Sequence, residues 1–233
     1  MNYGPKAVTS GLVLALDAAD KNSYSGTGAT WTDVSGTGNN GTLTNGPTFN
    51  TDNLGNILLD GTNDYVNVPY NVSFNPSSNL SFMIWTKLTV NDLSIRNPIE
   101  LSAASDELYF ILWRADLSPK RWGFGIRQSN NTYAETTSTS TNFSINTWYN
   151  IGLIANSSTG LVSLYINGVV DGSIAYNGTL KQNASATLAI GSDAANSRRY
   201  WQGNVSNVQI YNRALTATEM RQNYNATKGR FGL

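Results

Sequence analysis

Short apolar blocks separated by turn residues follow one another along the whole chain. In the clearest pair, Val162–Ile166 and Val169-Val170 flank Asn167-Gly168, a two-residue turn of the type that requires positive φ. Leu80–Leu88 is apolar on both strand faces, which predicts a central strand covered from both sides. Together the blocks predict about a dozen short antiparallel strands.

One helix signal stands out near the C-terminus. Thr216-Ala217-Thr218-Glu219 is a capping box, in which the Thr216 hydroxyl accepts from the amide of Glu219 and the Glu219 carboxylate reaches back. We expect the helix to run to about Asn225, with Gly229 as its stop. The pattern therefore predicts an all-β fold, a two-sheet antiparallel β-sandwich with one short C-terminal helix.

Length and composition exclude several classes of protein. A chain of 233 residues suits one large sandwich, and no Pro/Ser-rich linker or repeat divides it, so we expect a single domain over residues 1–233 with its core from about 10 to 226. The absence of Cys and His excludes disulfide scaffolds, thiol enzymes, Ser-His-Asp catalysis and imidazole-ligated metals.

Charge and hydropathy exclude two kinds of partner. The formal net charge is zero, which predicts no binding of nucleic acid. No stretch reaches the roughly 18 apolar residues of a membrane helix, and the first residues do not form a signal peptide. Only 13% of the residues are charged, so amides and hydroxyls must cover the surface, as is common in secreted, carbohydrate-binding and virion proteins.

Several segments, in order along the chain, give a resemblance to a known family. They are Gly11–Asp17, Trp31–Gly36, Asn39–Pro47, Leu59–Val66, Ser81–Trp85, Asn146–Tyr149, Val162–Gly168, Ala189–Gly191 and Trp201–Leu215. The chain resembles the laminin-G-like jelly-roll family of the concanavalin A-like lectin/glucanase superfamily. The resemblance implies two packed sheets of six or seven strands, one of them concave, and binding of carbohydrate or protein surfaces.

The two end segments, Met1–Tyr24 and Asn223–Leu233, are similar to laminin-G-like structural proteins of tailed bacteriophages. That similarity implies a place on the virion, as a head decoration or a tail-fibre component. The implied partners are other virion proteins, copies of the same chain and cell-surface glycans. A free secreted or periplasmic lectin, with an extracellular location, is the alternative.

Glycoside hydrolysis is the enzymatic option that the superfamily raises. It needs two carboxylates across the scissile bond, which the family's hydrolases place as Glu-x-Asp-x-Glu on one strand, and no such run occurs here. Asp106 and Glu107 are adjacent, so a regular strand would point them to opposite faces. We therefore expect no enzymatic activity and no required cofactor.

Calcium is the metal that this chain is best equipped to bind, because it offers only hard oxygen ligands. The candidates are Asp17 and Asp20 after the first strand, and Asp60, Asn63 and Asp64 in a tight turn. The alternative is turn chemistry, in which these side chains bond their own backbone.

A sugar site needs an exposed aromatic ring and planar polar groups. Tyr109 and Trp113 share one face of the strand Leu108–Arg114. Arg121 and Arg127 share a face of the next strand with Gly123 and Gly125, whose bare backbone a flat ligand could approach. We expect an aromatic–Arg–Gly groove if the two aromatics lie beside these glycines; otherwise the rings belong to the core or to a subunit interface.

Overall fold

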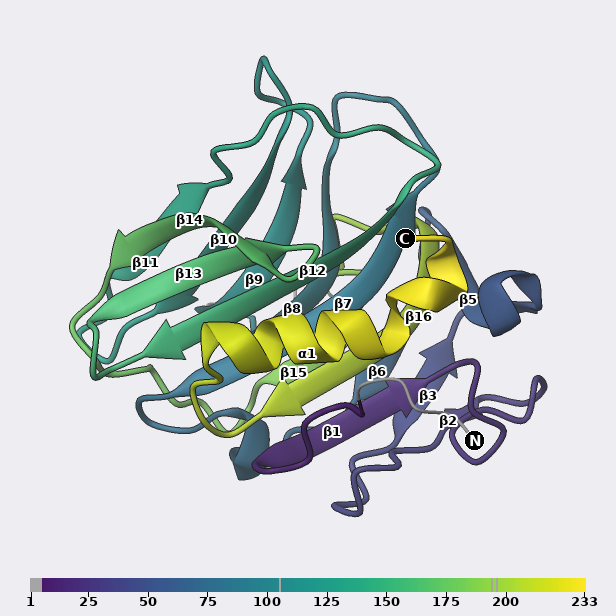
Figure 1. The fold of residues 1–233 in the computed structure, drawn as a ribbon, viewed down its shortest axis with the longest axis horizontal. Helices are drawn as coiled ribbons and strands as arrows, with labels where there is room; N and C mark the ends of the chain where they lie inside the picture. The colour runs from purple at the N-terminus through teal and green to yellow at the C-terminus, as the bar shows by residue number, and fades with distance from the viewer. Residues whose placement is uncertain (1–5, 105, 194, 196) are drawn as a thin grey trace.

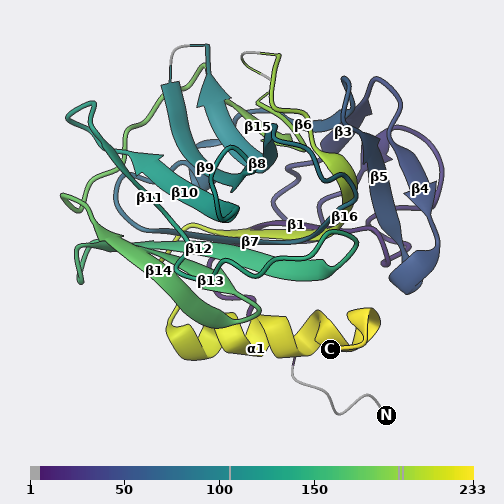
Figure 2. The same cartoon turned by 90° about the horizontal axis from the view of Figure 1, so that it is seen from above.

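Two antiparallel sheets, called sheet A and sheet B, account for the apolar blocks of the sequence (Figure 1). The computed structural model describes residues 6–104, 106–193, 195 and 197–233. Each sheet has eight strands, one or two more than the family resemblance implied. The sheets pack face to face, which confirms the predicted all-β sandwich (Figure 2).

The strands of sheet A share one continuous ladder, with β1 paired beside β5 on the same edge of β16. In spatial order they are β14 (Val169–Ala175), β13 (Leu161–Ile166), β12 (Trp148–Asn156), β7 (Leu80–Leu88), β16 (Gln202–Tyr211), β5 (Asn56–Asp60) and β4 (Thr48–Asn50), with β1 (Leu12–Asp17) on β16.

Sheet B lies opposite. Its strands, in spatial order, are β11 (Tyr133–Thr137), β10 (Arg121–Arg127), β9 (Asp106–Arg114), β8 (Ile95–Ala103), β15 (Thr187–Ile190), β6 (Tyr65–Val68), β3 (Gly41–Thr44) and β2 (Thr30–Trp31). Short 3₁₀ turns described in the chain are η1 (Asp52–Leu54), η2 (Val72–Phe74) and η4 (Lys228–Phe231).

The main core fills the space between the two sheets. Phe82 and Ile84 of β7 face Ile99 and Ile111 of sheet B from across this layer, and all four side chains are fully buried. The alternation along each strand puts every second residue into this layer. The predicted hairpin is also confirmed, because Asn167 and Gly168 join β13 to β14 with φ of 52° and 75°.

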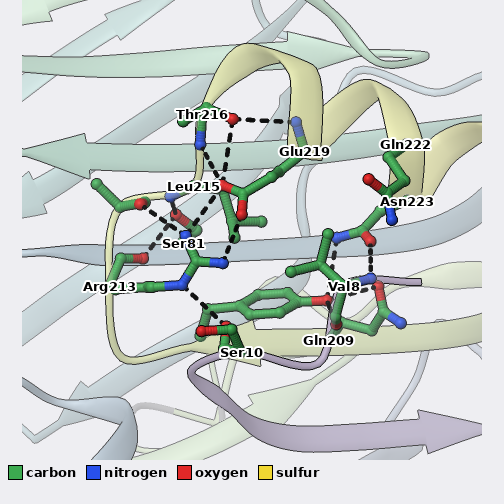
Figure 3. A network of polar contacts seen from close by, with 12 residues as sticks. Val8, Ser10, Ser81, Gln209, Arg213, Leu215, Thr216, Glu219, Gln222 and Asn223 are labelled. Atoms are coloured by element: carbon green, nitrogen blue, oxygen red, sulfur yellow. Dashed lines mark hydrogen bonds and ion pairs between the residues drawn. The ribbon is translucent and has the colours of Figure 1, made fainter. Parts of the chain in front are cut away.

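Helix α1 (Ala217–Thr227) lies on sheet A, on the side away from sheet B (Figure 2). The predicted capping box at Thr216 and Glu219 is present. Figure 3 shows how the helix is fixed: Arg213 pairs with Glu219, and Ser81 of β7 both donates to the Arg213 carbonyl and accepts from the Leu215 amide. Met220 packs into a second apolar cluster under the helix, together with Met83 of β7.

The C-terminal turn η4 completes the cover of sheet A. The Phe231 ring stacks on Trp85, with the ring centroids 4.0 Å apart, and contacts Trp148 in a tilted arrangement, with the centroids 4.8 Å apart. Trp85 Nε1 donates to the Thr227 hydroxyl. Trp31, Trp85, Trp148 and Trp201 are all buried, and Trp85 and Trp148 lie under the tail rather than between the sheets.

Among the described residues, no helix combines the length and the apolar character needed to cross a bilayer.

Candidate functional site

The outer face of sheet B carries an open hollow of about 470 Å³. Its floor is formed by Phe110 and Leu112 of β9, and Tyr133 and Glu135 of β11 form one wall. These side chains point away from the core because their strand neighbours Tyr109, Ile111 and Ala134 point into it.

The opposite wall comes from the segment before β16 and from the start of β9. Arg198 and Arg199 both donate to Glu107 Oε1, at 2.6 and 2.9 Å. Arg114, at one end, makes a two-bond ion pair with Asp116. Six of the eleven residues lining the hollow are charged, in a chain that is 13% charged overall. They are Asp106, Glu107, Arg114, Glu135, Arg198 and Arg199.

The expected placement of two aromatic residues in an open groove is wrong. Tyr109 is 2% exposed and Trp113 4% exposed, and both belong to the core between the sheets. The β9–β10 register explains the error. Gly123 pairs with Leu112 and Gly125 with Phe110, so the face that carries the glycines carries Phe110 and Leu112 instead.

The two glycines do not leave open backbone for a ligand. A Cβ atom at Gly125 would lie 2.7 Å from Glu135 Cβ and 2.8 Å from Phe110 Cζ, and one at Gly123 would lie 3.0 Å from Arg114 Cγ. The space that the missing side chains release is therefore taken by their neighbours. Glycine here lets Phe110 and Arg114 lie flat against β10, which shapes the floor of the hollow.

The two predicted arginines support the site from outside its lining. Arg121 donates to the carbonyl oxygens of Ser138 and Thr139, at 2.5 and 3.0 Å. Arg127 lies over the Tyr133 ring, 4.9 Å from its centroid, and donates to the Tyr133 hydroxyl at 2.7 Å. Arg127 thus holds the most accessible aromatic ring of the hollow, which is 38% exposed.

Asp106 and Glu107 both line the hollow, contrary to the opposite faces expected for adjacent residues. The β8–β9 register shifts at this point: Ser102 pairs with Glu107 but Leu101 pairs with Tyr109. Hydrogen bonding from Lys181 lowers the pKa of the Asp106 carboxyl, which also accepts from Asn183. The extra residue of the bulge is not visible in the sequence pattern.

Behind this wall lies a group of three carboxyl side chains, Glu100, Glu107 and Asp193. Each places an oxygen within 4.8 Å of the others. Glu100, on β8, is fully buried, and its burial, together with nearby Asp193 and Glu107, raises its pKa well above the ordinary value. Arg198 also donates from Nε to Asp193 at 2.6 Å.

The predicted calcium ligands lie elsewhere and make other bonds. Asp60 Oδ1 accepts from the amides of Thr62, Asn63 and Asp64, and the Thr62 amide is the main cause of a lowered Asp60 pKa. These bonds are the turn chemistry that the sequence left as the alternative. Asp64 accepts from the Asp60 amide, and burial raises its pKa.

Asp17 is engaged by the C-terminal tail. Its two carboxylate oxygens accept from Arg230 at 2.7 and 2.5 Å. Asp20 accepts from the backbone and side chain of Asn22, at 2.9 and 3.0 Å. Among the described residues, neither Asp17 nor Asp20 belongs to a group of three acidic side chains whose oxygens lie close together.

Sequence reasoning missed most of the lining of the hollow. Tyr133 and Glu135 alternate around buried Ala134 and could have been found as one face of an edge strand. Arg198 and Arg199 were visible as a charged pair, but only the fold brings them to Glu107, more than 90 residues away.

Comparison with known proteins identifies the fold independently. A family model described as the concanavalin A-like lectin/glucanases superfamily matches residues 60–221. Among curated protein sequences no match was found. Among solved structures, the receptor-binding domain of botulinum neurotoxin C/D mosaic serotype is similar, with a TM-score of 0.72 and 18% identity.

Two further solved structures give the same picture. The botulinum neurotoxin serotype D ligand-binding domain, in complex with N-acetylneuraminic acid, has a TM-score of 0.71 and 19% identity. The binding domain of Paraclostridial Mosquitocidal Protein 1 has a TM-score of 0.70 and 19% identity. In all three cases 93% of this chain aligns with 51–52% of the other, so it spans about half their length. At these identities the likeness shows the fold.

Proposed function

Because the chain belongs to the concanavalin A-like lectin/glucanase superfamily, we propose that it is a non-enzymatic carbohydrate-binding module whose glycan binds in the hollow on sheet B. The observation that carries the proposal is the lining of that hollow. The Tyr133 ring, which is 38% exposed, offers an apolar face in one wall, and charged donors and acceptors surround the hollow above the buried side chains of Phe110 and Leu112. A sugar ring presents the matching pattern, with an apolar face and a rim of hydroxyls.

The polar side chains that line the hollow keep hydrogen-bond donors and acceptors that can bind a ligand. Arg114 uses Nε and Nη2 on Asp116, and Arg199 uses Nη1 on Glu107, so each guanidinium keeps further N–H donors for a ligand. Within the described residues, no hydrogen bond or ion pair engages the Glu135 carboxylate, which is available to accept from hydroxyls. Tyr133 adds a partly exposed ring at the rim.

The absence of catalysis is also part of the proposal. A glycosidase needs a protonated carboxyl that reaches the leaving-group oxygen. The carboxyl with a raised pKa, Glu100, is fully buried, while Asp106 and Glu107 are bound by Lys181 and by two arginines.

A glycan array with a matched pair of variants tests the binding site. We expect wild type to bind a defined set of glycans, and Arg114→Ala to lose about tenfold in affinity, because a hydrogen bond to a charged group contributes about 1.5–3 kcal/mol. Arg221→Ala, on the far side of the molecule in α1, is the control and should bind as wild type. Equal binding by both variants would place the site elsewhere.

The same glycans test the absence of catalysis. Prolonged incubation with bound ligands should release no new reducing ends. Release that survives purification, and that Glu107→Gln abolishes, would show that the hollow is a glycosidase site after all.

A virion setting completes the proposal and rests on the similarity of the end segments to bacteriophage structural proteins. There the module would contact other virion proteins and copies of itself, and its glycans would lie on host cells. The presence of capsid and tail genes beside its own gene, and trimers or larger assemblies in size-exclusion chromatography, are the expected results. A clean monomer encoded away from such genes would favour the free extracellular lectin.

A further inference from the structure

The cluster of three carboxyl side chains behind the wall of the hollow is neutralised by fewer basic side chains than it has acidic ones. Glu100 on β8, Glu107 on β9 and Asp193 after β15 bring one oxygen each to within 4.8 Å of the others. Glu100 and Asp193 are buried and Glu107 is half-buried. Negative charges at this distance repel strongly when water is excluded, so the fold must supply positive charge to the group.

Two arginines supply positive charge to Asp193 and Glu107 but do not bond Glu100. Arg198 donates to Asp193 Oδ2 and Glu107 Oε1, and Arg199 donates to Glu107 Oε1. Across the described part of the chain, neither guanidinium donates a hydrogen bond to Glu100. Two cationic groups therefore face three carboxyl groups, and the most deeply buried of the three is the one that they do not bond.

Two buried acceptor oxygens at Glu100 have no donor among the described residues. Glu100 Oε1 is one of them. The other is Asn97 Oδ1, on an amide that is itself fully buried and lies against this carboxyl, since Asn97 Nδ2 donates to Glu100 Oε2. Buried polar atoms without partners are rare in native proteins, and each calls for a physical explanation. Both of these oxygens are acceptors, which a cation satisfies.

We propose that a hard divalent cation, with the preferences of Ca²⁺, binds at Glu100 and takes oxygen ligands from Glu107, Asp193 and the Asn97 side chain. Carboxylate and amide oxygens are the ligands that Ca²⁺ takes in proteins, and its flexible coordination tolerates ligands from separate segments. The ion would join β8, β9 and the segment after β15, and so hold Arg198 and Arg199 at the wall of the hollow. This site is distinct from the 60–64 turn, whose Asp60 oxygen is used by backbone amides.

Calorimetric titration of the full, metal-depleted chain with CaCl₂ tests the proposal, alongside thermal melting with Ca²⁺ and with chelator. We expect one ion per chain and a melting temperature that Ca²⁺ raises and chelator lowers again. Glu100→Gln and Glu107→Gln should each weaken binding by about tenfold or more. Asp60→Asn is the control, and it should titrate as wild type.

Two results would overturn the proposal. If wild type gives no heat and no shift in melting temperature, a proton rather than a cation neutralises Glu100. If both Glu variants bind Ca²⁺ as wild type does, or if only Asp60→Asn loses binding, the ion lies elsewhere. Glu107 is half-buried, so Glu107→Gln, checked by circular dichroism, keeps the test open should Glu100→Gln fail to fold.

Discussion

The outer faces of the two sheets are built from the same kinds of strand but end up in opposite states. On sheet A, α1 and the C-terminal turn cover the face, and aromatic rings such as Trp85 and Phe231 hold the cover down (Figure 2). On sheet B, the corresponding face is open and gathers charged side chains around Phe110 and Leu112. The comparison teaches that packed aromatic rings close the outer face of sheet A, whereas clustered charge and the partly exposed Tyr133 ring line the open face of sheet B.

The largest effect is expected from breaking the core that the two faces share. Trp113→Ala removes a ring that lies 5.2 Å from Trp122 and 5.9 Å from Phe143, centroid to centroid. We expect the free energy of unfolding to fall by about 3–5 kcal/mol, the usual cost of such a truncation in a core. Urea unfolding measures this, with Tyr133→Ala as the open-face control. A loss below about 1 kcal/mol would mean that Trp113 is accessible after all.

Removing the Phe231 ring, which packs the C-terminal turn onto sheet A, should lower the free energy of unfolding. Phe231→Ala removes the ring contacts with Trp85 and Trp148, and each aromatic pair contributes about 0.5–1.5 kcal/mol beyond the area it buries. We expect a fall of about 1–3 kcal/mol in the same measurement. Leu233→Ala, at a side chain 48% exposed, should leave stability unchanged. Equal stability of both variants would show that the tail does not close the face.

A smaller, pH-dependent effect is expected at the start of α1 (Figure 3). The ion pair with Arg213 lowers the pKa of Glu219 from 4.5 to about 2. A depressed folded-state pKa means stability that is present above about pH 4.5 and lost as the pH falls toward about 2. Glu219→Gln keeps the capping geometry but not the charge, so we expect it to cost up to about 1 kcal/mol at neutral pH.

Melting curves across this range provide the check. Wild type and Glu219→Gln should converge as the pH approaches about 2. A difference that stays constant from neutral to acidic pH would show that the charge of Glu219 is not what fastens the helix.

The open face should show the smallest effect on stability and a separate effect on binding. Glu135→Gln changes a carboxylate that no described residue engages, so the free energy of unfolding should move by less than about 0.5 kcal/mol. Glycan affinity should fall several-fold, because the neutral amide is a weaker acceptor for hydroxyls. Urea unfolding and glycan titration of the same protein sample measure the effect on stability and the effect on affinity separately. A large loss of stability would assign Glu135 to the fold.

Local chemistry made much of the fold predictable. The Asn167-Gly168 turn, the capping box at Thr216 and the doubly covered strand Leu80–Leu88 each follow from short stretches of sequence, and the structure contains all three. The resemblance to the superfamily was likewise confirmed by the match over residues 60–221.

The site was less predictable because it depends on pairing between strands. Alternation along β9 correctly separated Tyr109 and Trp113 from Phe110 and Leu112, but it could not say which set faces the core. Because both sets are largely apolar, the hydrophobic pattern of β9 is the same for either orientation. Only the packing of β9 against the other strands determines which set faces the core. Arg198 reaches Glu107 through long-range folding alone, which no local pattern encodes.

Backbone amide chemical shifts, followed while a glycan selected on the array is titrated in, test most directly whether the open face of sheet B is the binding surface. The account predicts shifts that change along β9, β10 and β11 and around Arg198-Arg199, with α1 and the C-terminal turn unaffected. Changes confined to the α1 side of sheet A, or to the 60–64 turn, would contradict it.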